Sequence, residues 1–344
     1  MEEVLNQEAA GHTHPELVAT FMDYLLKGRC GKDNIRDERQ LTNIINDTLE
    51  LFRYFTDKDI FGTFYRAQLA KRLLSKKSFS DDLEKFTISQ LKVMCSPQFT
   101  FKLEGMIKDY DLAKDADKMY DDHNSRNPAT APPVGDFSCH VLKTGHWPSF
   151  SRFPEVTLPE DMIACKEHFT KYYMMQPANS NRTLNWVFGQ GSATLRTTFD
   201  KGGWRDIDVA TIQAIVLLQF NKQRKFSVSG LAATCNLDMK NFKNIIGGMV
   251  QNPKAKVLIN TTSRKGIKDD DVLAFNYNFY TPSKKVTVPP PALTERKESV
   301  VPDDERRLTL DAAIVRVMKA RKVLTHTNLV QEVLQQIRFF RPDP

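Results

Sequence analysis

The chain has 344 residues, of which 41% are hydrophobic and 26% are charged, and this length predicts about two to four domains rather than one core. It has no apolar run of about 18 residues and no basic, apolar leader at its start, so the sequence predicts neither a membrane span nor a secretory signal. The 5 cysteines are scattered without CxxC pairs, which suits a reducing compartment and provides no zinc site. The net charge of +7 fits either an ordinary solvated surface or an attraction to acidic partners or nucleic acid.

The first part of the chain, from Glu16 to about Lys118, has the periodicity of amphipathic helices. Turn residues at 28–33 separate the first two helices, and two further helices are predicted over residues 59–74 and 81–94. The apolar residues at helix spacing on the first three helices are Leu17, Phe21, Leu25, Leu41, Ile44, Ile45, Leu49, Phe52, Phe61, Phe64, Tyr65, Leu69 and Leu73. We therefore expect a helical bundle over residues 1–122.

Aromatic residues are concentrated between Phe52 and Tyr65. They could form a groove for a partner, but aromatic residues at helix spacing favour a packed core. Basic residues gather at the end of the helix predicted over 59–74, and we expect them to interact with the negative end of that helix dipole. These residues are Lys71, Arg72, Lys76 and Lys77.

A turn-rich stretch from His123 to Gly135 marks a boundary, and a β-rich section follows it. Alternating residues predict strands at 137–141, 184–188 and 193–199, with a helix at 159–174. Strands divided by a helix form an α/β layer whose sheet can keep an open edge. Such an edge can accept a strand from another chain, or it can be covered by a loop of its own chain.

Residues 207–279 show the order helix, helix, helix, hairpin that is typical of a winged helix. The predicted helices are 209–221, 226–233 and 239–250, and the predicted strands are 256–259 and 272–275. Winged helices often bind DNA, and the candidate contacts here are Lys240, Asn241, Lys243 and Asn244 on the third helix and Arg264, Lys265 and Lys268 in the wing. The acidic run 269–271 and the lack of an arginine on the third helix favour a protein-interaction role instead.

The last segment begins with a proline-rich tether and ends with two predicted helices. If Leu310, Ile314, Val317 and Met318 form the buried stripe of the first helix, Lys319 points into solvent. An ordinary surface lysine is the alternative to a functional one. The second helix is predicted over 327–338.

The chain lacks the sequence patterns of common catalytic sites. It contains no GxxxxGK[ST], HExxH or GxSxG motif. Gly189 and Gly191 precede a predicted strand rather than a helix, which is the wrong context for phosphate binding. No histidine pair has a third ligand at convincing spacing, so the sequence predicts no metal site, no cofactor and no catalytic residue.

Several short motifs occur in a fixed order along the chain, at residues 51–54, 57–61, 64–66, 69–74, 89–92, 99–106, 141–148 and 314–322. In this order they resemble the cullin family, the scaffolds of multisubunit ubiquitin ligases. The resemblance runs from about position 45 to the end of the chain. It implies a non-catalytic scaffold, located in the cytoplasm and nucleus, that binds other proteins.

The resemblance also implies particular partners and sites. Lys319 corresponds to the lysine that accepts a ubiquitin-like modifier through an isopeptide bond, the reaction called neddylation. The α/β section would bind a RING-finger protein, which in turn holds a ubiquitin-conjugating enzyme, and a cullin exchange factor is a further candidate partner. The residues assigned to RING binding are Phe137, Cys139, Val141, Leu142, Trp147, Trp186, Leu195 and Phe199.

The expected fold class is therefore α+β and mainly helical. The expected domains are a helical bundle at 1–122 with the end of the cullin repeats, an α/β RING-docking domain at 136–206, a winged helix at 207–281, a linker at 282–304 and a partial second winged helix at 305–344. Family members carry further helical repeats before residue 51 and a recognition helix with a hairpin after the last two helices. The repeats recruit substrate adaptors in the family, and because the sequence contains hardly any of them, adaptor and substrate binding are not carried over to it. A winged-helix nucleic-acid-binding protein and a helical interaction protein without a ligase role are the alternatives.

Overall fold

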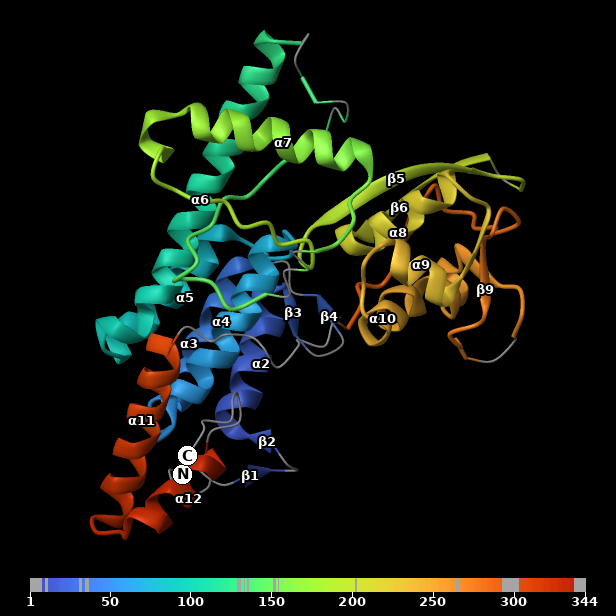
Figure 1. Ribbon diagram of the computed structural model, residues 1–344. Coiled ribbons are helices and arrows are strands. Elements are labelled where there is room, and N and C mark those ends of the chain that lie inside the picture. The colour runs from blue at the N-terminus through green and yellow to red at the C-terminus, as the bar shows by residue number, and fades with distance from the viewer. Residues whose placement is uncertain are drawn as a thin grey trace. The chain divides into compact units, whose positions relative to one another are not determined.

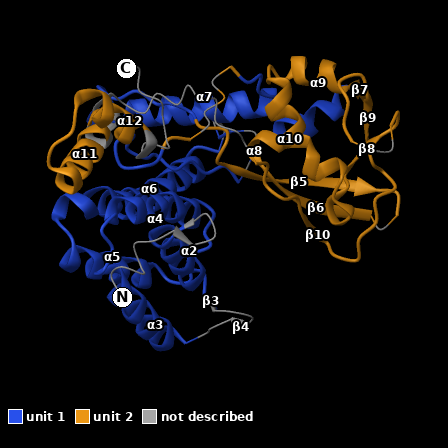
Figure 2. Ribbon diagram, turned by 90° about the horizontal axis from the view of Figure 1, so that it is seen from below, with its two compact units in different colours: residues 1–148, 156–186, 214–223 blue, residues 149–155, 187–213, 224–344 orange. Residues whose placement is uncertain are grey.

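The protein is described here by a computed structural model, in which it is a mainly helical α+β protein (Figure 1). Two compact units are distinguished in Figure 2: unit 1 comprises residues 1–148, 156–186 and 214–223, and unit 2 comprises residues 149–155, 187–213 and 224–344. The structure describes residues 8–9, 12–30, 33–34, 37–128, 131–132, 134, 136–150, 153, 155–201, 203–263, 266–292 and 303–336. No helix in these ranges combines the length and the apolar content needed to cross a bilayer.

Unit 1 is built mainly of helices. Its elements are β1 (Glu8–Ala9), β2 (His12–Thr13), α2 (His14–Leu26), β3 (Arg29–Cys30), β4 (Asp33–Asn34), α3 (Glu38–Phe52), α4 (Lys58–Leu74), α5 (Asp81–Met94), α6 (Pro97–Arg126), α7 (Glu160–Met175) and η1 (Pro177–Asn179). The helices predicted over 59–74 and 81–94 are confirmed by α4 and α5. Local sequence sets the start of α5, because the Ser80 side chain accepts a hydrogen bond from the Leu83 amide.

The core of the bundle is aromatic, as the spacing of its residues predicts. Phe52, Phe61 and Tyr65 are fully buried, with ring centroids 4.8 Å apart for Phe52 and Phe61 and 5.5 Å apart for Phe61 and Tyr65. The buried face predicted for α2 is wrong in part, because Leu17 and Phe21 are each 42% exposed. That helix instead buries Ala19, Met22, Leu25 and Leu26.

Arg72 is not a surface cation at the end of α4, as the sequence suggested, but a fully buried side chain. Its Nε and Nη2 donate to the two carboxylate oxygens of Glu84 at 2.7 and 3.0 Å, and its Nη1 donates to Asp23 at 2.8 Å. Glu84 also accepts from the Ser78 hydroxyl at 2.8 Å. A buried charge is tolerated only when it is paired and hydrogen-bonded. Since the partners of Arg72 come from α2 and α5, this requirement ties the two helices to α4.

The strands predicted at 137–141 and 184–188 are wrong, since both segments are irregular. They pack instead against α6 and α7 around a buried cluster of Tyr120, Phe169 and Tyr173. Helix α6 runs to Arg126, further than the sequence suggested. The alternation of apolar and polar residues in these segments therefore reflects packing against helices and not pairing in a sheet.

Unit 2 contains two small sheets and several short helices. Its elements are β5 (Ser192–Phe199), β6 (Gly203–Ala210), β7 (Lys225–Ser227), α9 (Val228–Thr234), α10 (Met239–Val250), η3 (Pro253–Ala255), β8 (Leu258–Asn260), β9 (Val272–Phe275), β10 (Lys285–Thr287), α11 (Asp303–Arg321) and α12 (His326–Gln336), while α8 (Thr211–Leu218) and η2 (Gln219–Asn221) lie around its boundary with unit 1 in the sequence. The predicted strand at 193–199 and the predicted helix at 239–250 are confirmed. Strand β6 covers residues that the sequence assigned to a loop and to the start of a helix.

The two sheets differ in strand order and in strand direction. One has the order β10-β6-β5, in which β6 is central, antiparallel to β5 and parallel to β10. The other has the order β7-β9-β8 and is antiparallel throughout. Strand β7 precedes α9, and the antiparallel pair β8 and β9 follows α10, so the predicted hairpin after the third helix is present.

Helices α11 and α12 pack on each other around a small core. Ala313, Val317 and Val333 are buried there, and Leu310, Leu324 and Leu329 pack against them. The predicted stripe of α11 is right for Leu310 and Val317 and wrong for Ile314, which is 37% exposed.

Candidate functional site

Strand β5 forms one edge of its sheet. It pairs with β6 along its whole length, from Ser192 opposite Ala210 to Phe199 opposite Gly203. Among the residues that the structure describes, no strand pairs with its other side. A strand of eight residues with a free side offers a row of backbone donors and acceptors to an additional strand.

The two faces of β5 differ in exposure and in chemistry. Ala193, Leu195 and Thr197 are half-buried and Phe199 is buried, while the residues between them are exposed. Phe199 packs against the rings of Phe275 and Phe279, at centroid distances of 5.7 and 5.4 Å. The inner face is therefore apolar and only partly covered beside the free edge.

The outer face of the same sheet is charged and internally paired. Arg196 of β5 donates two hydrogen bonds to Asp206 of β6 at 2.8 and 3.1 Å, and these bonds hold the pKa of Asp206 below its usual range. Thr194 donates to Asp208 at 2.8 Å, and Lys285 of β10 lies 2.8 Å from the other Asp208 oxygen. These cross-strand contacts fix the register of the three strands.

Gly191 directly precedes β5, at a point where two chain segments meet. The Thr211 amide donates to the Gly191 carbonyl at 2.9 Å, and a Cβ on Gly191 would overlap the Thr211 hydroxyl. This glycine serves a close backbone approach and not a phosphate, in agreement with its place before a strand.

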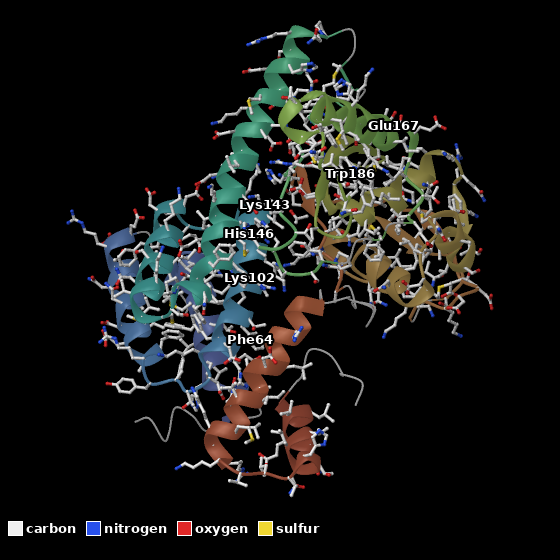
Figure 3. The ribbon with its side chains drawn as sticks, turned by 60° about the vertical axis from the view of Figure 1, so that its left-hand side comes forward. Phe64, Lys102, Lys143, His146, Glu167 and Trp186 are labelled. Carbon is white, nitrogen blue, oxygen red and sulfur yellow. The ribbon has the colours of Figure 1, made fainter. Side chains whose placement is uncertain are left out.

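The segment 141–148 is held in unit 1 by a single buried carboxylate. Asp109 Oδ2 accepts from the Lys143 amide at 3.1 Å and from Trp147 Nε1 at 3.2 Å, and it lies 3.0 Å from His146 Nδ1. A Cβ on Gly105 would lie 2.6 Å from the His146 ring. Two motifs distant in the sequence, 99–106 and 141–148, thus meet on α6 (Figure 3), and Trp147 is buried.

The structure divides the residues assigned to RING binding between the two units. Leu195 and Phe199 lie in unit 2, and the other six lie in unit 1. Phe137, Cys139, Val141 and Trp186 pack on the Tyr120 cluster, and burial raises the pKa of the Cys139 thiol to about 12. Leu142 is half-buried. The unit 1 residues have a packing role that explains their apolar character, and their assignment to RING binding stays a prediction.

Lys319 lies on α11 with its side chain exposed, as expected. The helix ends two residues later at Arg321, whose Nε lies 3.3 Å from Glu332 of α12. The acceptor role of Lys319 stays a prediction, and its exposure meets one requirement for it.

Three of the residues considered for nucleic-acid contact, all on α10, bond to other parts of the chain: Asn241 donates to Asp238, Asn244 donates to the Ala292 carbonyl, and Lys243 pairs with a carboxylate. Lys243 of α10 forms an ion pair with Asp269 at 2.5 Å. Asp271 does not lie on the surface: its Oδ2 accepts from Asn260 at 2.6 Å, from Ser263 at 2.7 Å and from the Lys268 amide at 2.8 Å. Arg264 and Lys265 lie outside the described residues.

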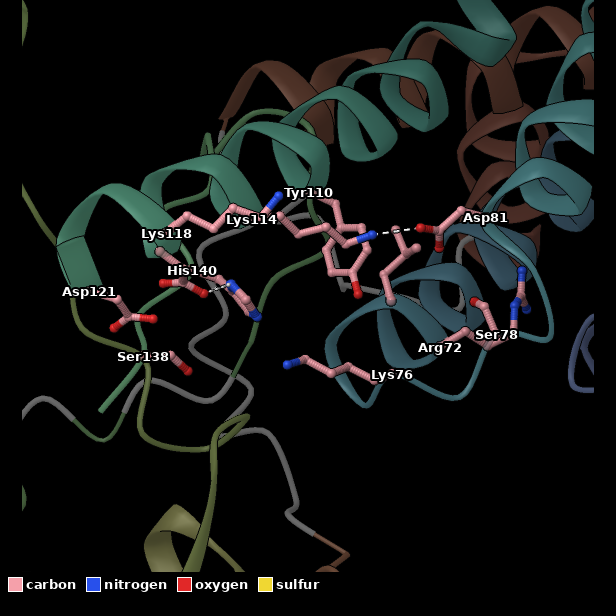
Figure 4. A pocket seen from close by; sticks show the side chains of 12 residues that line it. Arg72, Lys76, Ser78, Asp81, Tyr110, Lys114, Lys118, Asp121, Ser138 and His140 are labelled. Atoms are coloured by element: carbon pink, nitrogen blue, oxygen red, sulfur yellow. Dashed lines mark hydrogen bonds and ion pairs between the residues drawn. The ribbon is translucent and has the colours of Figure 1, made fainter. Parts of the chain in front are cut away.

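A pocket of about 530 Å³ opens in unit 1 beside α4 and α6 (Figure 4). Two contacts lie within its lining: Lys114 pairs with Asp81 at 2.6 Å, and His140 Nδ1 lies 3.2 Å from Asp117. Over the described part of the chain, no group of three or more His, Cys, Asp or Glu residues could hold a metal ion. Lys76, Lys118 and Asp121 also line the pocket.

These features define the class of the molecule, which is a mainly helical α+β protein with a free strand edge and an exposed lysine on a separate helical pair. Comparison with known proteins gives its family. Three family models match, described as the cullin alpha solenoid domain over residues 1–117, the cullin alpha+beta domain over residues 141–279 and the cullin protein neddylation domain over residues 305–344. The chain belongs to the cullin family.

Curated relatives agree with this assignment. The chain is 36% identical to Cullin-1 of Oryza sativa subsp. japonica and 34% identical to Cullin-2 of Arabidopsis thaliana, in each case over 98% of its length. It is 35% identical to Cullin-4A of Mus musculus over 94% of its length. It spans 45%, 45% and 42% of these relatives, respectively, which is less than half of each. None of these matches supports the alternative of a nucleic-acid-binding protein.

Sequence reasoning missed two features that matter for the site. It did not find β6, although Ile207 and Val209 alternate with Asp206 and Asp208 as a half-buried strand requires. It also missed Asp109, whose three contacts come from residues more than 30 positions away. A local pattern could have revealed β6, whereas Asp109 has no local signal.

Proposed function

We propose that this protein is a non-catalytic scaffold subunit of a multisubunit cullin–RING ubiquitin ligase. The observation that carries the proposal is the free edge of β5, within the segment matched by the cullin alpha+beta domain. The match of residues 305–344 to the cullin neddylation domain supports it separately. On this proposal the chain acts by holding other proteins in place.

The free edge of β5 would take up an extended segment of a RING-finger protein as a fourth strand of the sheet. Backbone hydrogen bonds supply affinity in such a pairing, and alternate side chains supply specificity. Apolar side chains of the added strand would cover Leu195 and Thr197 on the inner face. Its other side chains would lie beside Thr194 and Arg196 on the charged outer face.

Catalysis would then come from placement. The RING protein would hold a ubiquitin-conjugating enzyme, and the scaffold would keep that enzyme near a bound substrate. An encounter between two free molecules becomes nearly intramolecular in this way, which removes much of its entropic cost.

Lys319 would accept a ubiquitin-like modifier. Its ammonium first loses a proton, and Nζ then attacks the carbonyl carbon of the modifier's thioester. The new C–N bond forms as the C–S bond breaks, the carrier leaves as a thiolate, and the nitrogen releases a second proton to give the isopeptide. Exposure of the side chain is required for this attack, because the thioester must come within about 3–3.5 Å of Nζ.

We also infer a division of roles along the chain that keeps the boundaries expected from the sequence. The α/β section at 136–206 would dock the RING protein, and residues 207–281 would form a winged helix used for protein contacts. Residues 305–344 would form part of a second winged helix, which carries Lys319. The order of α9, α10 and the β7-β9-β8 sheet supports the first winged helix.

A binding experiment with a matched pair of variants tests the proposal. Leu195→Asp places a charge on the inner face beside the free edge, and Thr198→Asp places one on the exposed outer face of the same strand. Co-expression with a RING-finger protein and size exclusion should show a complex for the wild type and for Thr198→Asp. Leu195→Asp should weaken it by about tenfold or more, since burying a charge against an apolar segment costs 1.4 kcal/mol or more.

Thermal unfolding of both variants provides the control for folding. Binding of the RING protein with wild-type affinity to folded Leu195→Asp would contradict the proposed use of this edge.

A further inference from the structure

The backbone groups on the free side of β5 can be assigned to particular residues. The Asp206 amide of β6 donates to the Lys284 carbonyl at 2.9 Å, so Asp206 directs its backbone groups away from β5. Arg196 lies directly opposite Asp206. Because opposite residues of an antiparallel pair exchange both backbone hydrogen bonds or neither, the amide and carbonyl of Arg196 point to the free edge. Alternation along the strand extends this direction to Ser192, Thr194 and Thr198.

The side chains of these four residues lie on the exposed outer face of the sheet. Arg196 is the one charged residue among them. A strand that bonds to the backbone of Arg196 would therefore place one of its own side chains opposite the guanidinium. The Cβ atoms of such a pair lie about 4.5–5.5 Å apart, which is close enough for direct contact.

The guanidinium of Arg196 is held in place on the side that faces β6. Its Nε and Nη2 donate to the two Asp206 oxygens at 2.8 and 3.1 Å, and its Cζ lies 4.6 Å from the centroid of the Trp204 ring. The third nitrogen, Nη1, lies on the side of the planar group away from Asp206, which is the side of the free edge. Among the described residues, none accepts a hydrogen bond from Nη1.

The charges around Arg196 favour an acidic partner. Arg196 pairs with Asp206, and Lys285 pairs with Asp208 at 2.8 Å. Lys284 adds a further cation, since its Nζ lies 5.4 Å from the centroid of the indole ring that Arg196 also contacts. These three cations face two carboxylates, so the local excess is positive and is complementary to a carboxylate of another protein.

We propose that Arg196 determines which strand can complete the sheet, by pairing with an aspartate or glutamate of the RING-finger protein that lies opposite to it. This inference rests on the proposed function, because it requires a strand to be added to β5. Nη1 would donate to the incoming carboxylate, while Nε and Nη2 stay with Asp206. Arg196 also sets the register, since a slip by two residues would place the acidic side chain beside Thr194 or Thr198.

The test uses the full chain and a RING-finger protein, and it measures their affinity by titration calorimetry at several salt concentrations. Arg196→Gln should weaken binding about fivefold and flatten its dependence on salt, because it removes the charge of a cross-strand pair. Arg196→Glu should weaken binding about tenfold or more, since like charges would then lie opposite each other. Thermal unfolding shows whether each variant is folded, and Arg196→Gln places no second negative charge beside Asp206.

Lys285→Gln is a matched control. Lys285 and Arg196 are 64% and 68% exposed, and their partner carboxylates are 26% and 25% exposed. Lys285 lies on β10, at the other edge of the same sheet, so Lys285→Gln should bind with nearly wild-type affinity. An equal loss in Lys285→Gln and Arg196→Gln would assign the effect to the net charge of the sheet and overturn the role of Arg196.

Reversal of charge on the partner identifies the paired residue. Each aspartate and glutamate in the segment of the RING-finger protein that the complex protects from hydrogen exchange is changed to lysine. One of these variants should restore binding to Arg196→Glu, and restoration by none would overturn the inference.

Two outcomes separate this inference from the proposed function. If Arg196→Gln bound with wild-type affinity and salt dependence while β5 became protected, the selective role of Arg196 would be wrong and the added strand would stand. If the complex formed without protection of β5, the proposed use of the edge would be wrong, and the role of Arg196 with it.

Discussion

The helical bundle of unit 1 and the β10-β6-β5 sheet of unit 2 differ in whether their polar groups have partners within the chain. In the bundle, the buried guanidinium of Arg72 is matched by Glu84 and Asp23. In the sheet, the outer charges are paired across strands, but one side of β5 has no partner strand among the described residues. The buried charges of the bundle are paired within the chain, as its stability requires. The edge strand of the sheet has backbone groups on one side that a strand of a second protein could bond.

The largest effect is expected from breaking the buried network. Arg72→Met should destabilise the protein by about 3–5 kcal/mol, because it leaves the carboxylate of Glu84 buried without its partner. Urea unfolding followed by circular dichroism measures the change. Arg196→Met, which breaks an exposed pair on the sheet, is the matched control and should shift the midpoint little. An equal loss of unfolding free energy in the two variants would contradict the claim that the buried pair stabilises the protein more than the exposed pair does.

A smaller effect is expected where the segment 141–148 meets α6. Gly105→Ala should cost about 1–3 kcal/mol, since its Cβ would overlap the His146 ring at 2.6 Å and the ring or the helix would have to shift. Gly145→Ala is the control, because a Cβ there meets no atom within 4 Å. The double variant Gly105→Ala with His146→Ala should recover part of the loss. If Gly105→Ala unfolded at the same urea concentration as Gly145→Ala, this packing would not stabilise unit 1.

The smallest effect is a local dependence on pH in the β8–β9 hairpin. The Lys268 amide and the Ser263 hydroxyl hold the pKa of Asp271 below its usual range. A carboxyl with a lowered pKa in the folded state stabilises it above the unfolded value of about 3.9, and this contribution is lost as the pH falls through the folded pKa. The protection factors of the hairpin amides, which are corrected for the intrinsic dependence of exchange on pH, should therefore fall in acid.

Asp271→Asn provides the comparison for that measurement. The variant should have lower protection factors in the hairpin at neutral pH, and these should no longer fall in acid. An acid response of the same size in Asp271→Asn would assign it to another group.

The part of the fold that sequence could predict is the part that local residues determine. Helices α5 and α10 were predicted with their bounds, since Ser80 and Asp238 cap them and their apolar residues follow helix spacing. The segments at 137–141 and 184–188 alternate as strands do, yet they are irregular because the aromatic cluster of α6 and α7 provides the surface on which they pack. Arg72 looked like a surface cation because its partners lie 12 and 49 residues away.

The features of the candidate site likewise separate into those that local sequence predicts and those that depend on packing between distant residues. The exposure of Lys319 and the alternation of β5 follow from periodicity, and both were predicted. The assignment of eight residues to one RING-binding surface came from the order of motifs, which carries no information about packing. The structure places six of these residues in unit 1, where Trp147 and Trp186 have partners of their own.

The central claim is that the free edge of β5 receives a strand from another protein. Amide hydrogen exchange of residues 192–199, measured with and without a RING-finger protein, tests it most directly. The account predicts that amides of β5 on the side away from β6 exchange rapidly in the isolated chain and become protected in the complex. A stable complex in which the exchange of β5 does not change would contradict it.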